Sequence, residues 1–110
     1  MGEYHEWRWR TLHKEWKLPS HRVVHYWAAN GVFGDGRRNV GSGNRLWFSE
    51  QELDQLEALA VLTNALQKLG FNGLPIPVVK ALWSAFKEGK RGAVVELDGV
   101  SLVAELRDRG

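Results

Sequence analysis

Residues 41–52 read GSGNRLWFSEQE, in which a glycine-rich, basic segment leads into a short apolar segment and then into the start of a helix. Ser49 followed three residues later by Glu52 is a capping box, a side-chain pattern that opens helices. Leucines recur at steps of three and four residues from Leu53 to Leu69, and Gly70 follows. The stretch therefore predicts a long amphipathic helix between Ser49 and Gly70.

A hairpin is predicted just before this helix, with Val32-Phe33 as one arm and Leu46-Trp47-Phe48 as the other. Glycine and asparagine between the arms favour tight turns, and arginines make the tip basic. Neither Gly34-Asp35-Gly36 nor Gly41-Ser42-Gly43 completes a GxGxxG motif, and the sequence has no Gly-Lys-Ser/Thr, so a nucleotide-binding loop is not supported. A basic hairpin tip is instead suited to the phosphate backbone or the minor groove of DNA.

Two short helices are predicted upstream of the hairpin. Apolar residues at helical spacing from Trp9 to Trp16 predict the first, which ends near Pro19. Ser20 is the expected N-cap of a second helix over residues 21–30, and Gly31 is the residue expected to end it. The side chains expected to face the core are Val24, Trp27 and Ala28. Two short helices joined by a few residues predict a helix-turn-helix.

Downstream, Pro75 and Pro77 mark the start of a fourth helix that is expected to end near Gly89. The tail changes to a period of two, and Asp98-Gly99 predicts a two-residue hairpin turn. The turn pairs Leu97 with Val100 and Val95 with Leu102 on one apolar face. A two-stranded ribbon is only marginally stable alone, so this face is expected to cover either the chain's own helices or a second copy of the chain.

Length and composition fit one small globular unit, since the chain has 110 residues, is 44% apolar and contains no cysteine. Disulfides and thiolate sites are excluded, and no apolar run approaches the length that spans a bilayer. The N-terminus lacks the pattern of a secretory signal, so we expect a soluble, cytoplasmic protein with no membrane contact. Residues 1–47 carry eight Lys/Arg and four Asp/Glu, hence +4, whereas residues 48–110 carry seven and nine, hence −2. A basic N-terminal half suggests a face for a polyanion.

Other functions have weaker support in the sequence. His21 and His25 stand at i, i+4, a spacing that can bind a metal, but no third ligand is evident, so no metal or other cofactor is expected. No carboxylate pair or Ser/His/Asp set has a supporting motif, so we do not expect an enzyme. A protein-protein adaptor, using the apolar hairpin and the acidic helix after Ser49, stays open as an alternative.

The order of these elements resembles the winged helix-turn-helix of the MerR family, including short phage, actinobacterial and excisionase-like members. Residues 20–27, SHRVVHYW, with Gly31 are similar to the family's recognition helix, and residues 43–49, GNRLWFS, are similar to its wing strand. His25 stands where the family usually has Arg. The family's long dimerising helix has no counterpart, so its coiled-coil dimer is not implied. The resemblance implies a mainly α fold of about four helices with a basic β-hairpin wing, followed by the C-terminal hairpin.

The functional expectation is a sequence-specific double-stranded DNA-binding protein, a small transcriptional regulator associated with the nucleoid. An excisionase-like recombination factor, a DNA-packaging factor or an adaptor are the alternatives. We expect residues 1–89 to form the DNA-binding domain and residues 90–110 a hairpin that serves self-association into a homodimer. The residues expected to contact DNA are Lys14, Lys17, Ser20, His21, Arg22, His25, Tyr26, Arg37, Arg38, Asn39, Ser42, Asn44 and Arg45.

Overall fold

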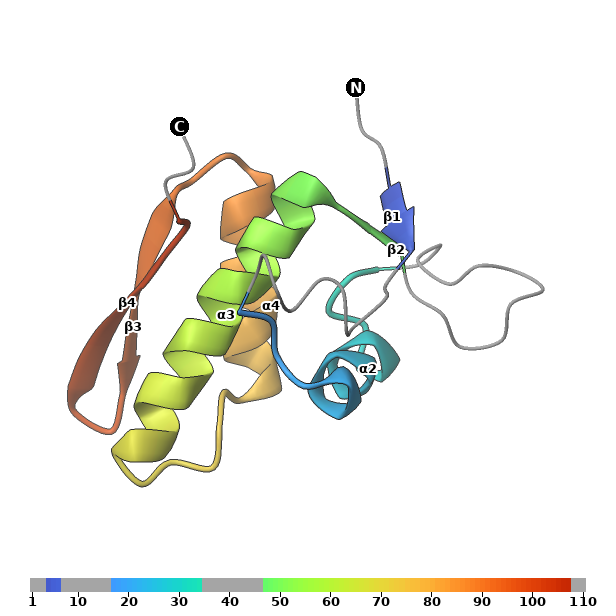
Figure 1. The fold of residues 1–110 in the computed structure, drawn as a ribbon. Coiled ribbons are helices and arrows are strands. Elements are labelled where there is room, and N and C mark those ends of the chain that lie inside the picture. The colour runs from blue at the N-terminus through green and yellow to red at the C-terminus, as the bar shows by residue number, and fades with distance from the viewer. Residues whose placement is uncertain (1–3, 7–16, 35–46, 108–110) are drawn as a thin grey trace.

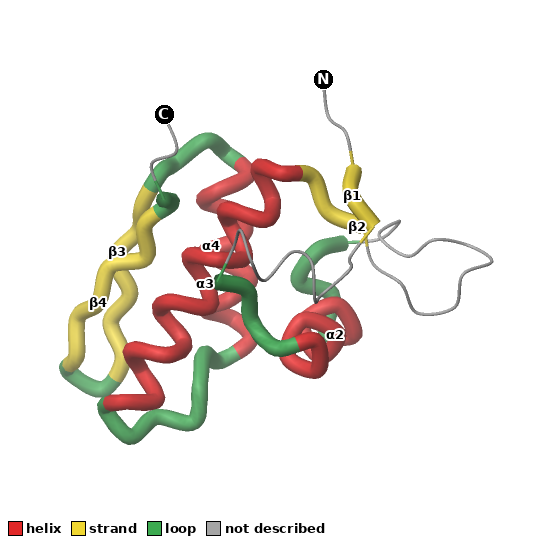
Figure 2. Tube along the Cα trace, viewed as in Figure 1, coloured by secondary structure: helices red, strands yellow, loops and turns green. Residues whose placement is uncertain are grey.

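The computed structural model describes residues 4–6, 17–34 and 47–107 (Figure 1). In chain order the elements are β1 (Tyr4–Glu6), α2 (His21–Ala29), β2 (Trp47–Ser49), α3 (Glu50–Lys68), α4 (Ile76–Lys87), β3 (Gly92–Leu97) and β4 (Val100–Glu105). The strands form two antiparallel pairs, β1 with β2 and β3 with β4. Helices α3 and α4 lie between these two pairs, and α2 lies on the side of β1 and β2 (Figure 2).

This architecture corrects the fold predicted from the sequence. The described residues form three helices and two separate strand pairs, which does not match a winged helix-turn-helix of about four helices with an additional hairpin. The helix predicted from Trp9 to Trp16 and the tip of the predicted wing, residues 35–46, lie outside the described residues.

The strand before α3 also has a different partner from the predicted one. Residues Trp47–Ser49 pair with Tyr4–Glu6, with His5 opposite Phe48, rather than with Val32-Phe33. The physical reason lies at the end of α2. The backbone N–H of Val32 donates to Trp27 O at 3.1 Å, which folds the chain back over the helix, and both Val32 and Phe33 are buried in the turn that follows. Because this turn holds their backbone, they do not extend as a strand.

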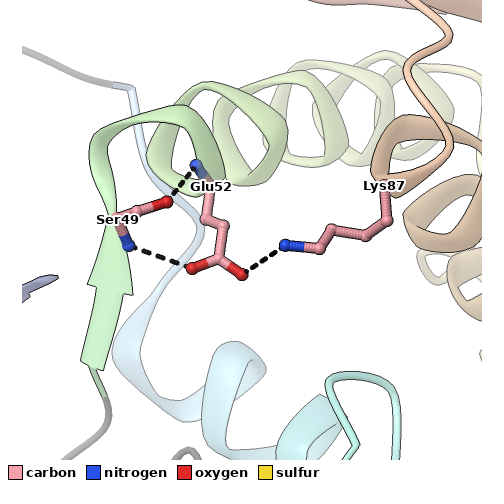
Figure 3. Close-up of polar contacts among 3 residues, drawn as sticks. All are labelled: Ser49, Glu52 and Lys87. Carbon is pink, nitrogen blue, oxygen red and sulfur yellow. Dashed lines mark hydrogen bonds and ion pairs between the residues drawn. The ribbon is translucent and has the colours of Figure 1, made fainter. Parts of the chain in front are cut away.

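The predicted capping box at the start of α3 is confirmed. Ser49 Oγ accepts a hydrogen bond from the Glu52 backbone N–H at 3.2 Å, and Glu52 Oε1 accepts one from the Ser49 backbone N–H at 3.0 Å. Figure 3 shows that the same carboxylate also faces Lys87 at the end of α4.

Five of the predicted leucines of α3 are buried, namely Leu53, Leu56, Leu59, Leu62 and Leu66. Leu69 differs, since it lies beyond the last helical residue and is exposed.

Helix α4 begins and ends where the sequence predicts. Pro75 is the N-cap residue and Pro77 stands in the first turn, where a missing N–H costs nothing. Gly89 follows the last turn with φ of 101°, a conformation that favours glycine. The inward side chains of the helix include Trp83, whose ring meets Phe33 and Phe48 edge-on at centroid distances of 4.8 and 6.4 Å. This aromatic cluster joins the turn after α2, strand β2 and helix α4 in one core.

The C-terminal hairpin has the predicted register, with Val95 opposite Leu102 and Leu97 opposite Val100. Asp98 and Gly99 form the turn with φ of 49° and 81°, as a two-residue turn of this type requires. Strand β4 packs against α3 and strand β3 against α4, which buries Val95 on the inner face. The sequence left open whether this face packs on the chain's own helices or on a second copy of the chain, and in the structure it packs on the chain's own helices. Self-association stays a prediction, and it would need another surface.

Across residues 4–6, 17–34 and 47–107, none of the helices has both the length and the apolar character needed to cross a membrane.

Candidate nucleic-acid interface

Helix α2 is held at both ends by its own chain. At the start, Ser20 Oγ accepts a hydrogen bond from the Val23 backbone N–H at 3.2 Å. At the end, Gly31 has φ of 79° and its N–H donates to Ala28 O at 3.1 Å, one residue before Val32 donates to Trp27 O. This pair of bonds is a Schellman ending, which satisfies carbonyls that would otherwise lack partners. The predicted cap and terminator of the helix are therefore confirmed.

One face of α2 is fixed in the core. Val24 and Trp27 have almost no exposed surface, and Val23 and Ala28 pack against the same cluster. The predicted inward residues of this helix are thus confirmed. Because two buried side chains of different shape set its rotation, α2 presents one defined face to the outside.

The outward face of α2 is a stripe of four exposed residues at helical spacing. The stripe, named here the α2 stripe, consists of Arg22, Tyr26, Ala29 and Asn30. Tyr26 is 57% exposed, a high value for a large aromatic side chain. Asn30 Nδ2 donates to Tyr26 O at 2.8 Å, so its amide is directed back onto the helix end. The stripe therefore combines a cation, an aromatic hydroxyl and a small apolar side chain.

The surroundings of the stripe carry positive charge. Residues 17–34 contain Lys17 and Arg22 but no Asp or Glu. From α4, Lys80 comes close to the end of α2, since its Nζ lies 3.9 Å from the position that a Cβ on Gly31 would occupy. Lys80 is exposed near the end of α2, and Lys17 is exposed three residues before its Ser20 cap. Sequence reasoning missed Lys80, because it is separated from α2 by about fifty residues and no local motif singles it out.

The expected contact residues within the described chain have unequal positions. Arg22 and Tyr26 are exposed on the stripe, whereas His25 is half-buried. Ser20 uses its hydroxyl as the helix cap. Lys17 is exposed, and its backbone N–H donates to Glu57 Oε2 at 2.7 Å, which anchors the segment before α2 to α3. His21 begins the helix, and its side chain is outside the description.

The remaining expected contacts lie outside the described residues. They are Lys14, Arg37, Arg38, Asn39, Ser42, Asn44 and Arg45. Their contribution to DNA binding stays a prediction from the sequence. In the part of the chain that the structure describes, no three His, Asp or Glu side chains are grouped so that they could hold a metal ion.

A cavity of about 210 Å³ lies at the other side of α3, between the end of α4 and the base of the C-terminal hairpin. Its lining includes the cationic residues Lys90, Arg91 and Arg107, but also the carboxylate of Asp54. Arg107 Nη1 additionally lies 3.5 Å from Glu57 Oε2, so part of its charge is balanced within the chain. The mixed charge of this cavity selects no ligand class as clearly as the α2 stripe does.

Comparison of the chain with protein-family models, with curated proteins and with solved structures gives no significant match. The role of α2 therefore has to be inferred from its own side chains and their surroundings.

Proposed function

We propose that this protein binds double-stranded DNA, with α2 lying in the major groove. The observation that carries the proposal is the α2 stripe, in which Arg22 and Tyr26 project outward from a helix whose opposite face is fixed by Val24 and Trp27. A major groove about 12 Å wide admits one α-helix, and outward side chains then meet the base edges. A helix that is rigidly docked on its own core can present such side chains in one register.

Three members of the stripe have chemical partners on DNA. The guanidinium of Arg22 can donate two hydrogen bonds to O6 and N7 of a guanine, the most frequent specific contact to a base. The hydroxyl of Tyr26 can donate to a phosphate oxygen. Ala29, which is exposed on the same face, is small enough to let the helix approach and can contact a thymine methyl group.

The charges beside the helix supply the sequence-independent part of the binding. Lys80 near the end of α2 and Lys17 in the segment before it can contact phosphates on the strands that border the groove. Residues 17–34 contain no Asp or Glu, and the Glu57 carboxylate beside Lys17 is buried. Regulation of transcription is the activity we propose for the bound protein.

The first step of the test is selection of bound sequences from random duplex DNA. The selected duplex and a scrambled duplex are then titrated with the wild type, Arg22→Ala and Lys68→Ala, an equally large loss of charge at the exposed end of α3. Loss of a guanidinium contact to a base costs about 1–3 kcal/mol, or about 5- to 150-fold in affinity. Arg22→Ala should lose that much on the selected duplex and less on the scrambled one, whereas Lys68→Ala should match the wild type.

Two results would overturn the proposal. One is failure to enrich any duplex with a protein that circular dichroism shows to be folded. The other is that Arg22→Ala binds each of the two duplexes with the same affinity as the wild type does. In either case the exposed Tyr26 and its neighbours become a candidate surface for a protein partner, which is the adaptor function. If DNA binding holds, selection with supercoiled attachment-site DNA separates a recombination factor from a regulator.

A further inference from the structure

Strand β3 has a free outer edge in the described chain. Strands β3 and β4 form a sheet of two, and no other described strand joins it. The backbone O of Arg91 accepts from Leu106 N–H at 2.8 Å, so these two residues form a hydrogen-bonded pair at the base of the ladder. Hydrogen-bonded and non-hydrogen-bonded residue pairs alternate along an antiparallel ladder. The next residues in the non-hydrogen-bonded positions are Gly92, Val94 and Glu96, so their backbone N–H and C=O groups point away from β4. This edge therefore presents regularly spaced donors and acceptors.

At the end of β4 the chain comes near its own N-terminal part. Beyond its last residue, Arg107 approaches Glu57, and the same carboxylate oxygen accepts from the Lys17 backbone. The segment before α2 therefore comes near the end of β4. Both β3, residues Gly92–Leu97, and β4, residues Val100–Glu105, lack lysine and proline, the residues that usually protect an exposed edge strand from pairing. The segment near the end of β4 therefore makes the edge of β3 the more accessible of the two.

We propose that β3 pairs antiparallel with β3 of a second copy of this chain, about a two-fold axis at Val94. The two hairpins then form one continuous sheet whose inner face is already covered by α3 and α4 of each copy. In this register the backbone groups of Val94 bond to those of the partner's Val94, and Gly92 stands opposite the partner's Glu96. A single self-complementary strand is sufficient for a closed dimer, because a two-fold axis uses the same surface twice.

The side chains of the outer face fit this register. Val94 is 64% exposed, and its cross-strand neighbour Val103 is 57% exposed. Pairing at the axis brings two Val94 side chains together and removes apolar surface from water. Val94 is therefore the residue on which the contact depends most.

Charges at the two ends of β3 are complementary in the same register. Glu96, near the turn, is exposed, and so is Lys90, two residues before the start of the strand. Antiparallel pairing brings the partner's Lys90, which lies beyond the start of the partner's β3, near both Glu96 and the exposed Asp98 of the turn, at separations that long side chains bridge. Gly92, directly opposite, has no side chain to block the approach. The backbone of Lys90 is fixed, since its N–H donates to Ala85 O at 3.1 Å.

The contact is small, and the dimer should accordingly be weak. One strand edge with a few side chains buries less than the roughly 1,200–2,000 Å² typical of stable specific complexes. A dissociation constant on the order of tens of micromolar is the expected result, measured by sedimentation from about 5 to about 500 µM.

The decisive comparison is Val94→Lys against Val103→Lys. Both residues are exposed, lie opposite one another and face the same side of the hairpin, so their replacement should affect folding equally. Val94→Lys places two like charges at the axis and should weaken the dimer by about tenfold or more. Val103→Lys should change it less than about threefold. A wild type that is monomeric at the highest concentration overturns the proposal. Equal loss of dimer affinity in both variants also overturns it and indicates that the hairpin faces stack. Loss of dimer affinity in Val103→Lys alone overturns it too and indicates pairing through β4.

A charge exchange tests the register independently of position 94. Lys90→Glu and Glu96→Lys should each weaken the dimer several-fold, because each places like charges across the contact. The double variant should recover part of the lost association, since the pairs between residues 90 and 96 are restored with reversed sign, whereas Asp98 opposite residue 90 keeps its negative charge. Failure of the double variant to recover overturns this register. The inference does not depend on DNA binding: these measurements use the protein alone, and Arg22→Ala should associate like the wild type.

Discussion

Lys87 Nζ lies 2.9 Å from Glu52 Oε2, and this ion pair joins the end of α4 to the beginning of α3. The two partners differ in environment, because the Glu52 side chain is 2% exposed and that of Lys87 is 45% exposed. Glu52 also caps α3 through Ser49. A buried carboxylate needs compensation, whereas an exposed ammonium can return to water. The contributions of the two residues to stability are therefore unequal.

The first prediction concerns this asymmetry. Glu52→Gln keeps the shape of the side chain and removes its charge, and it should lower the free energy of unfolding by about 1–2 kcal/mol. Lys87→Met leaves the buried carboxylate less compensated and should cost more, about 2–3 kcal/mol. In the double variant the loss should be smaller than the sum. Urea unfolding of all four proteins provides the cycle, and additive losses would contradict a direct coupling between the residues.

The second prediction concerns the capping box alone. Ser49→Ala removes the acceptor of the Glu52 N–H bond and should cost about 1 kcal/mol. Ser84→Ala, at an exposed position within α4, is the matched control and should change stability by less than about 0.5 kcal/mol. Equal thermal midpoints for the two variants would show that the cap does not stabilise α3.

The third prediction concerns the turn that follows α2. Phe33 contacts Trp83 and Phe48, with its ring centroid 5.1 Å from that of Phe48. Phe33→Ala should therefore cost about 3–5 kcal/mol, and Phe33→Leu much less, because leucine fills part of the space. Tyr26→Ala, at an exposed aromatic residue of α2, should leave the unfolding transition nearly unchanged. Similar losses for Phe33→Ala and Tyr26→Ala would be inconsistent with the buried position of Phe33.

Sequence reasoning located the elements whose boundaries are set by neighbouring residues. Ser20, the Ser49-Glu52 box and the Asp98-Gly99 turn each act over a few residues, and the structure has all three as predicted. The partner of the strand before α3 was predicted wrongly, although the register of the C-terminal hairpin was predicted correctly. The partner of Trp47–Ser49 is Tyr4–Glu6, more than forty residues away, and no local pattern marks that short segment as a strand. Val32-Phe33 was the nearer apolar pair, but the helix ending directs it into the core.

In the candidate interface, too, features set by neighbouring residues were predicted, whereas features set by distant parts of the chain were not. Periodicity placed Arg22 and Tyr26 on the outer side of a helix, which requires only the positions of Val24 and Trp27. Periodicity also placed His25 there, yet it is half-buried because residues beside the stripe border the core. Lys80 was not predicted, since its approach to Gly31 depends on how α4 packs beside α2.

The fourth prediction concerns the helix ending that fixes α2. Gly31 adopts φ of 79°, and a Cβ there would meet nothing closer than Lys80 Nζ at 3.9 Å, so the cost of a side chain is conformational rather than steric crowding by neighbours. Gly31→Ala should lower stability by about 1–2 kcal/mol. Gly31→Asn should cost less, because asparagine tolerates this conformation better. Equal losses for the two variants in urea unfolding would argue against a left-handed residue at this position.

The last prediction separates the two kinds of DNA contact proposed for α2. Lys80 lies at the end of the helix rather than on the stripe, so it should contact phosphate and carry no sequence preference. Lys80→Gln should then weaken the selected and scrambled duplexes by the same factor and reduce the slope of log K against log salt by about one. Arg22→Ala should instead reduce the ratio between the two duplexes. Lys68→Gln, at the far end of α3, serves as the control for loss of charge and should leave slope and ratio unchanged. The measurement is a titration of each variant at salt concentrations from about 50 to 200 mM. An unchanged slope in Lys80→Gln would exclude Lys80 from the interface, and an unchanged ratio in Arg22→Ala would remove the base contact that the proposed specificity requires.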